Sequence, residues 1–471
     1  MSASPFTVPG PLLFFAVPLA LAVLAYLLHR WTALSGLVAA IGSLGLGWIA
    51  LYWLLDKPIS LLGRSLILTP DFVFLGRPWA LTAASAVIVV FGLIVGGLCF
   101  LLALPASQGW AFYPFGLAVL GVLNLSATAE QVIYVILFFW LGTVLTGFVL
   151  AGGRPGTTMG ALRLIISSTL AAMLLLLLPT FLQSDADPST QRAGVVLGIL
   201  GLSVLLMMPP FHGALVGAAA FSAPMPPAFI LSILPVSMLH IFFQLVETYP
   251  TILEDGSILD LCRWLGLGAV ILGGLAAPGQ RRWGSLIGYA MLIDWGISMI
   301  ALGQGSPEGM ALAVNMLVGR SLALLLCGAG LTPLFQAAGK KDDLDQCRGL
   351  LFHRPLNVLA LLLGLLMLAG LPTPFGVAGR WALIPYLVDT NPQIVWIIIL
   401  AGIGVAVSAV VGLLACLGKP DPKIEGQRWE ETIAFAFGLL ALWMVGALLL
   451  NAPVWQMLLE NALSTLSVFA P

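Results

Sequence analysis

Long apolar runs joined by short polar connections are the feature that most constrains this chain. Runs of about 20 apolar residues can cross the hydrocarbon core of a bilayer as helices, and such runs recur along nearly the whole sequence. Hydrophobic residues make up 60% of the 471 residues and charged residues 8%, whereas about 25% of residues are charged in a soluble domain. The sequence therefore predicts an all-α polytopic membrane protein.

We predict about 14 membrane spans, with an error of one. They lie at 11–28, 34–55, 79–104, 111–127, 131–152, 160–182, 194–211, 226–246, 258–276, 284–303, 309–336, 356–388, 393–417 and 431–450. The tail 453–470 is a weaker amphipathic segment. Because no basic residues precede the run 11–28, we interpret it as a first span and not as a cleaved signal peptide.

The distribution of Lys and Arg among the loops predicts the orientation in the membrane. With the N-terminus outside, eleven of these residues fall on the cytoplasmic side and five on the outer side. This asymmetry favours a multi-pass protein of the cell membrane, a bacterial inner membrane, with its N-terminus outside.

Several classes of function are disfavoured by what the chain lacks. The net charge of −1 gives no reason to expect nucleic-acid binding. The cysteines form no CxxC pair and have no histidine at metal-ligand spacing, so we predict no disulfide framework and no metal site. No nucleotide-binding motif and no large soluble domain are present. We therefore expect no cofactor and no active site of its own, and energy for transport would come from an ion gradient or a partner.

Arg380 is the most informative single residue. It follows a Pro- and Gly-rich stretch, 371–379, between the apolar runs 357–370 and 381–388. A charge at membrane depth is costly and is by default a functional-site hypothesis, and a broken helix exposes backbone groups that lipid cannot satisfy. Together these features predict an ion-translocation apparatus or the remains of one.

A second break is predicted in the region 205–228. Pro209-Pro-Phe-His212 ends one span and Ala223-Pro-Met-Pro-Pro227 opens the next, and two such proline clusters force a non-helical connection. His240 follows in the next span. A histidine can pass protons near neutral pH, but a lone histidine on an apolar helix is more often a packing residue, and both interpretations stay open.

Asp294 lies in the middle of the span 284–303. Its candidate partners are Arg320 and Arg380 on later spans, and we expect at least one of them within ion-pair range because an unpaired charge in lipid is costly. A structural ion pair and a proton-relay role are equally compatible with the pattern. Arg163 lies near a span end, where its side chain can extend to the interface.

A series of motifs follows in a fixed order over roughly 110–420. They are Leu137-Phe-Phe-Trp-Leu-Gly-Thr-Val-Leu-Thr-Gly-Phe-Val-Leu150, Pro210-Phe-His212 with Ala223-Pro-Met-Pro226, Arg281-Arg-Trp-Gly-Ser-Leu-Ile-Gly-Tyr289, Asp342-Asp-Leu-Asp-Gln-Cys-Arg-Gly-Leu350, and Met367-Leu-Ala-Gly-Leu-Pro372 with Gly379-Arg-Trp381. The series resembles the L-, M- and N-type antiporter-like subunits of respiratory complex I, which are related to Mrp antiporter subunits.

The resemblance implies 14 helices and two inverted repeats, each with a broken helix. It suggests N-terminal helices at 1–110, a first repeat at 111–250, a second at 251–420 and a C-terminal helix and tail at 421–471. It also implies a central row of charged residues that relays protons, and partners among other membrane subunits of a complex I-like, hydrogenase-like or Mrp-like assembly.

This chain departs from the family at most of those charged positions. The family's fifth-span glutamate falls at Leu141, its seventh-span lysine at Leu205, and its eighth-span lysine near 236–238. The tenth-span histidine falls at Asp294, and the lysine of the broken twelfth span falls at Arg380. Arginine does not release its proton at accessible pH, so the inner proton path is largely degenerate.

Three functions remain open. The chain could belong to a complex I-like NADH:quinone oxidoreductase, or to a related redox- or Mrp-type assembly, and conduct protons by a reorganised path. It could instead be a structural membrane subunit that does not translocate ions. A stand-alone transporter of another solute is a third possibility. The loss of the lysine–glutamate couple favours the structural role.

Overall fold

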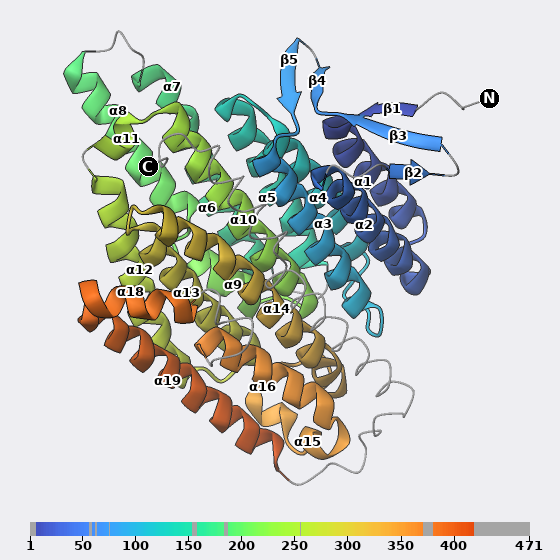
Figure 1. Ribbon diagram of the computed structural model, residues 1–471. Coiled ribbons are helices and arrows are strands. Elements are labelled where there is room, and N and C mark those ends of the chain that lie inside the picture. Colours follow the sequence, from blue (N-terminus) through green and yellow to red (C-terminus); the bar gives the residue numbers. More distant parts are fainter. Residues whose placement is uncertain are drawn as a thin grey trace.

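The computed structural model describes residues 6–55, 59–61, 64–74, 76–152, 158–182, 187–254, 256–370 and 380–418. Within these ranges the chain is a bundle of membrane-length helices with a few short strands at one end (Figure 1). Ten of the described helices are long and apolar enough to cross a membrane. The protein is therefore a multi-pass, predominantly helical membrane protein, as the sequence predicts.

The helices follow the predicted spans, except that the helix predicted at 194–211 lies at Pro188–Leu205. Three helices open the chain, α1 (Gly10–Leu27), α2 (Thr32–Leu54) and α3 (Ala83–Ala103). The next group is α4 (Phe112–Thr128), α5 (Val132–Ala151), α6 (Met159–Leu176), α7 (Leu178–Phe181), α8 (Pro188–Leu205), α9 (Gly213–Ala220), α10 (Met225–Thr248) and α11 (Thr251–Glu254). The last described group is α12 (Ser257–Ala276), α13 (Trp283–Leu302), α14 (Pro307–Ala337), α15 (Leu350–His353), α16 (Pro355–Ala369), α18 (Ala382–Thr390) and α19 (Pro392–Cys416). The predicted span 431–450 and the tail 453–470 lie outside the described residues.

Short strands before α1 and between α2 and α3 are the main feature that the sequence prediction did not include. Strand β1 (Phe6–Pro9) pairs in parallel with β3 (Arg64–Thr69), and β2 (Ile59–Leu61) pairs with β3 in antiparallel. Strands β4 (Asp71–Phe74) and β5 (Arg77–Ala80) form a hairpin. Because residues 77–80 are a strand, the helix predicted to begin at 79 begins at Ala83.

Local polar caps define where several helices begin. Thr82 and Ser85 form a reciprocal capping box at the start of α3, with the Ser85 N–H donating to Thr82 Oγ1 at 3.2 Å. Asp187 accepts the Thr190 N–H at the start of α8, and Ser306 accepts the Gly309 N–H at the start of α14. These side chains satisfy helix N–H groups that have no partner inside the helix.

The break predicted within 205–228 is confirmed. Helix α8 ends at Leu205, and α9 occupies only Gly213–Ala220 before α10 begins at Met225. Residue Met207, just after α8, has φ of 50°, outside the helical range. In the second half α16 ends at Ala369, Gly370 has φ of 102°, and α18 begins at Ala382. The predicted break at 371–379 itself lies outside the described residues.

The order of long and interrupted helices is the same in two parts of the chain. The interrupted pair α8 and α9 follows α4, α5 and α6, and the pair α16 and α18 follows α12, α13 and α14. In Figure 1 the green helices α6, α9 and α10 lie between the first, blue helices and the last, orange helices. The pseudo-two-fold axis that would relate the two parts, and the segment boundaries at 110, 250 and 420, stay predictions.

Small residues let the helices of the second part approach closely. A Cβ added at Gly364 of α16 would lie 2.6 Å from the Ala323 carbonyl oxygen and 2.9 Å from the Cys327 backbone nitrogen, both in α14. Without a hydrophobic force between helices in lipid, such close backbone packing is a main source of helix association.

We predict that Gly364→Ala destabilises the protein by about 1–3 kcal/mol, because the new methyl group meets backbone atoms that cannot move without separating α14 from α16. The measurement is reversible unfolding in mixed detergent micelles. Gly45→Ala is the control, since a Cβ there meets nothing within 4 Å. Equal stability of the two variants would contradict the close packing.

Candidate functional site: a buried ion cluster beside a broken helix

Three charged residues from distant parts of the chain meet inside the second half. Asp294 lies near the middle of α13, Arg320 lies in α14, and Arg380 lies just before α18. Their exposed fractions are 7%, 2% and 5%. All three are therefore buried in the protein interior, and we call them the ion cluster.

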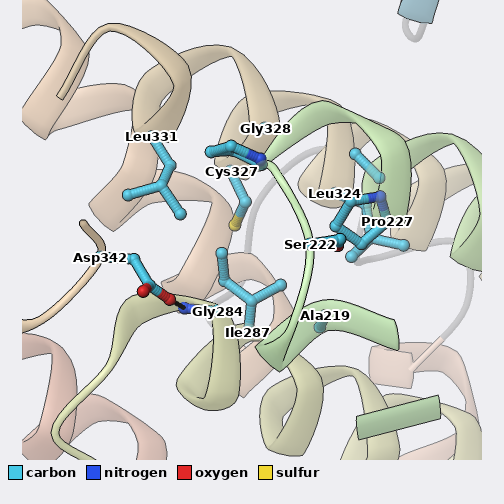
Figure 2. Close-up of a pocket in the computed structure, with 12 residues that line it drawn as sticks. Ala219, Ser222, Pro227, Gly284, Ile287, Leu324, Cys327, Gly328, Leu331 and Asp342 are labelled. Carbon is cyan, nitrogen blue, oxygen red and sulfur yellow. Dashed lines mark hydrogen bonds between the residues drawn. The ribbon is translucent and has the colours of Figure 1, made fainter. Parts of the chain in front are cut away.

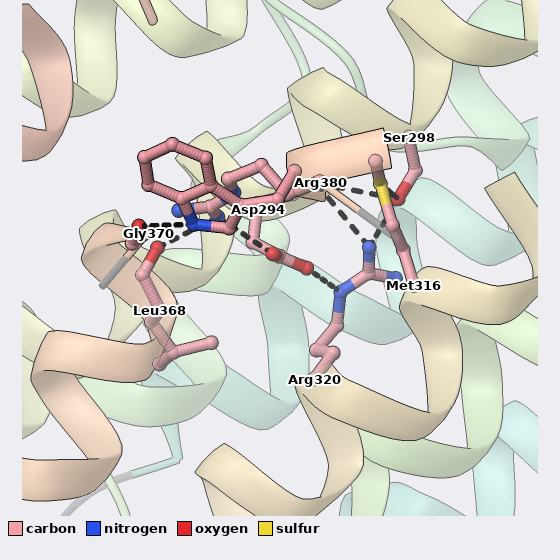
Figure 3. Close-up of polar contacts among 8 residues, drawn as sticks. Asp294, Ser298, Met316, Arg320, Leu368, Gly370 and Arg380 are labelled. Atoms are coloured by element: carbon pink, nitrogen blue, oxygen red, sulfur yellow. Dashed lines mark hydrogen bonds and ion pairs between the residues drawn. The ribbon is translucent and has the colours of Figure 1, made fainter. Parts of the chain in front are cut away.

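Asp294 is bound by both arginines (Figure 3). Arg320 Nε donates to Asp294 Oδ2 at 2.5 Å, and Arg380 Nη2 donates to Asp294 Oδ1 at 2.7 Å. The two guanidinium groups thus approach opposite oxygens of one carboxylate. The sequence predicted that at least one of these arginines would pair with Asp294, and the fold brings both.

Arg380 also binds the end of the interrupted helix α16. Its Nη2 donates to the Leu368 carbonyl oxygen at 2.8 Å, and the neighbouring Trp381 Nε1 donates to the Gly370 carbonyl oxygen at 3.0 Å. The last carbonyl groups of a helix have no partner inside it, and lipid offers none. Arginine suits this position because it carries a permanent charge and five donors.

Arg320 has further partners that sequence reasoning missed. Its Nη2 donates to the Ser298 hydroxyl and, at 3.3 Å, to the Asp294 carbonyl oxygen. Its guanidinium carbon lies 4.9 Å from the ring centroid of Trp295, within cation–π range. The available signal was the spacing in α13, because a serine four residues after a buried carboxylate lies on the same helix face.

The cluster carries one carboxyl group and two guanidinium groups. In the part of the chain that the structure describes, Arg320 Nη1 and Arg380 Nη1 are buried and have no hydrogen-bond partner. Removing one member of a buried charge group leaves the others uncompensated in a low-dielectric interior. Asp294 is therefore the member on which both arginines depend.

The two candidate histidines are not joined to this cluster. His240 is 8% exposed within α10, and His212 lies between α8 and α9. Among the described residues no hydrogen bond connects either histidine to Asp294, and His240 Nε2 and His212 Nδ1 have no partner. Arg163 lies elsewhere, in α6, with its guanidinium carbon 5.7 Å from the Phe221 ring centroid.

The three positions of the first half at which the resembled family carries titratable residues hold no titratable side chain in this chain. Leu141 of α5 is 39% exposed on the outer surface of the chain, and Leu205 at the end of α8 is 2% exposed. Residues 236–238 are buried within α10. A proton path through the first half would have to avoid these side chains.

A second polar cluster holds the loop-side end of α13. Arg282 Nε and Nη2 donate to Asp342 Oδ1 at 3.1 and 2.8 Å, and the Gly284 N–H donates to Asp342 Oδ2 at 3.3 Å. Figure 2 shows Asp342 at one side of a small pocket whose other walls include Ser222, Ile287 and Cys327. The carboxylate therefore caps α13 and ties it to the loop after α14.

The fold and the ion cluster together indicate the class of protein to which this chain belongs. A multi-pass helical protein with interrupted helices that end beside buried charges is built like a secondary transporter or an ion-translocating membrane subunit. The sequence comparison is specific: residues 135–406 match the family model "NADH:quinone oxidoreductase/Mrp antiporter, TM". This chain belongs to that family, as its motifs predicted.

Two curated relatives and one solved structure illustrate the likeness. NADH-quinone oxidoreductase subunit N of Cereibacter sphaeroides is 27% identical over 305 residues, which cover 60% of this chain and 64% of the relative. NADH-quinone oxidoreductase subunit 14 of Thermus thermophilus is 27% identical over 419 residues, covering 84% and 93%. A chain of the Mrp complex from Dietzia sp. DQ12-45-1b has the same fold, with a TM-score of 0.77, 17% identity and coverage of 98% and 97%.

We predict that Asp294→Asn destabilises the protein by about 3–5 kcal/mol, since it leaves two buried guanidinium groups without a carboxylate. Unfolding in mixed micelles measures the change. Asp260→Asn is the matched control, because it removes a surface pair with Arg263 at 3.4 Å whose acidic side chain is 62% exposed. That pair should contribute about 1 kcal/mol or less. Similar losses in the two variants would refute a buried ion cluster.

Proposed function

We propose that this chain is an antiporter-like membrane subunit of a complex I-like NADH:quinone oxidoreductase or a related redox- or Mrp-type assembly. In this role it scaffolds ion translocation by its neighbours and has no active site of its own. Its partners are other membrane subunits of that assembly. We place it in the cell membrane with the N-terminus outside, as the distribution of Lys and Arg favours.

The observation that carries the scaffolding role is the ion cluster. Arg380 donates to both Asp294 and the Leu368 carbonyl oxygen, so it stabilises an interrupted helix and a buried carboxyl group together. An arginine biases neighbouring charges but does not shuttle protons. Leu141 and Leu205 stand at the positions of the family's glutamate and lysine, and these apolar side chains also support the scaffolding role.

A conducting role is the second candidate, and the histidines favour it. His212 Nδ1 and His240 Nε2 are buried and have no partner in the described residues. Waters between His212, His240 and Asp294 would complete a path for protons, since imidazole titrates near neutral pH. Such a path would bypass Leu141 and Leu205.

We predict that Arg380→Leu lowers the yield of the intact assembly more than it lowers proton flux per assembled complex. The reason is that the change leaves Asp294 with one guanidinium partner and removes the donor to the Leu368 carbonyl oxygen. The assembly is reconstituted in vesicles that contain a pH-sensitive dye, and flux is normalised to the amount of intact complex.

His240→Leu is the companion variant, and it should leave the flux unchanged. The scaffolding role is wrong if Arg380→Leu and His240→Leu both leave the complex intact and stable but abolish proton translocation. That outcome would establish the conducting role.

A further inference from the structure

Trp295 contacts both the ion cluster and the first broken helix. The side chain is fully buried in α13. Its Nε1 donates to the Leu206 carbonyl oxygen at 2.7 Å, while its ring lies against the Arg320 guanidinium group at 4.9 Å. Consecutive residues of a helix point about 100° apart, so Asp294 and Trp295 reach different neighbours from one rigid element.

Leu206 is the residue that directly follows α8 and caps its C-terminal end. Helix α8 ends at Leu205, and Met207 has φ of 50°. Leu206 is 2% exposed, so its carbonyl group depends on a protein donor, and an unpaired one would be costly in an apolar interior. The indole N–H of Trp295 supplies that donor from the other half of the chain.

The second interrupted helix ends at the other side of the same group. Arg380 donates to the Leu368 carbonyl oxygen in the last turn of α16 and to Asp294 Oδ1. Direct contacts therefore join the ends of α8 and α16 without a gap. In order, the chain of contacts is Leu206, Trp295, Arg320, Asp294, Arg380 and Leu368.

We propose that Trp295 is a positioning residue that couples the C-terminal ends of α8 and α16, so that a change at the end of α16 alters the stability of the end of α8. When Arg380 shifts, the Asp294 carboxylate shifts with it, and Arg320 follows the carboxylate. The Trp295 ring then loses its best cation–π geometry with the Arg320 guanidinium group. The Trp295–Leu206 hydrogen bond then weakens. This coupling is an energetic link between two elements, and it holds whether or not the chain conducts protons.

Hydrogen exchange of the full chain in lipid nanodiscs tests the coupling. Trp295→Phe keeps an aromatic ring for Arg320 and removes the N–H donor. We expect the amides of 203–208 to exchange roughly fivefold faster in this variant, the factor that corresponds to one lost hydrogen bond. Arg380→Lys, in the other half, should also speed exchange at 203–208, because lysine keeps the charge but loses the planar fork.

The decisive comparison is between backgrounds, as in a double-mutant cycle. The Trp295→Leu chain has neither the aromatic ring nor the N–H donor. Adding Arg380→Lys to this chain should leave the exchange rate of the amides at 203–208 the same as in Trp295→Leu alone. In a Trp140→Phe chain its effect should persist. Trp140 is the matched control because its indole donates one hydrogen bond, to Thr169 Oγ1 at 2.9 Å, between α5 and α6.

Two results would overturn the proposal. Exchange at 203–208 that does not respond to Arg380→Lys, while exchange at 364–370 rises, would show that the ends of α8 and α16 are independent. Effects of Arg380→Lys that are equal with and without Trp295 would show that another route links them. If Arg380→Lys does not fold, Ser298→Ala replaces it, since that change removes a hydroxyl group that accepts from Arg320 and donates to the Asp294 carbonyl oxygen and Met316 Sδ.

Discussion

One carboxyl group held between two guanidinium groups is the interaction on which the centre of this protein depends. Asp294 lies on α13, and its partners come from α14 and from the segment just before α18. Because charges in a low-dielectric interior are stable only with close partners, this one residue fixes the relative depth of three helices. It also fixes Arg380, which in turn satisfies the end of α16. The ion cluster thereby stabilises the end of a helix whose last carbonyl groups lipid could not satisfy.

The same cluster supports our proposal that this chain is a scaffold and does not relay protons. A relay needs groups that gain and lose protons, and arginine does not lose its proton at accessible pH. The apolar Leu141 and Leu205 occupy the positions where the resembled family carries its couple. The family membership and the interrupted helices show that the architecture of an ion-translocating subunit is retained. The residues at the family's charged positions differ from those that the resemblance implies, and this difference is why we favour a scaffolding role.

Trp295 connects the ion cluster to the first half of the chain. Its indole N–H satisfies the end of α8 while its ring contacts Arg320. The two interrupted helices are thus stabilised by neighbouring residues of one helix, α13. A scaffold that couples the ends of α8 and α16 in this way would hold the two helices in register through the contacts of Asp294 and Trp295.

The sequence by itself determined the membrane class, the approximate positions of the described spans, a break within 205–228 and the identity of the buried charges. It could do so because the bilayer imposes one length and one polarity on every span, and both are properties of local sequence. The tertiary structure alone decided that both arginines bind Asp294, that Trp295 reaches Leu206, and that Arg282 binds Asp342. The short strands before α3 also appeared only in the structure. Such contacts depend on the rotation and depth of each helix against its neighbours, and packing between residues far apart in the sequence sets these quantities.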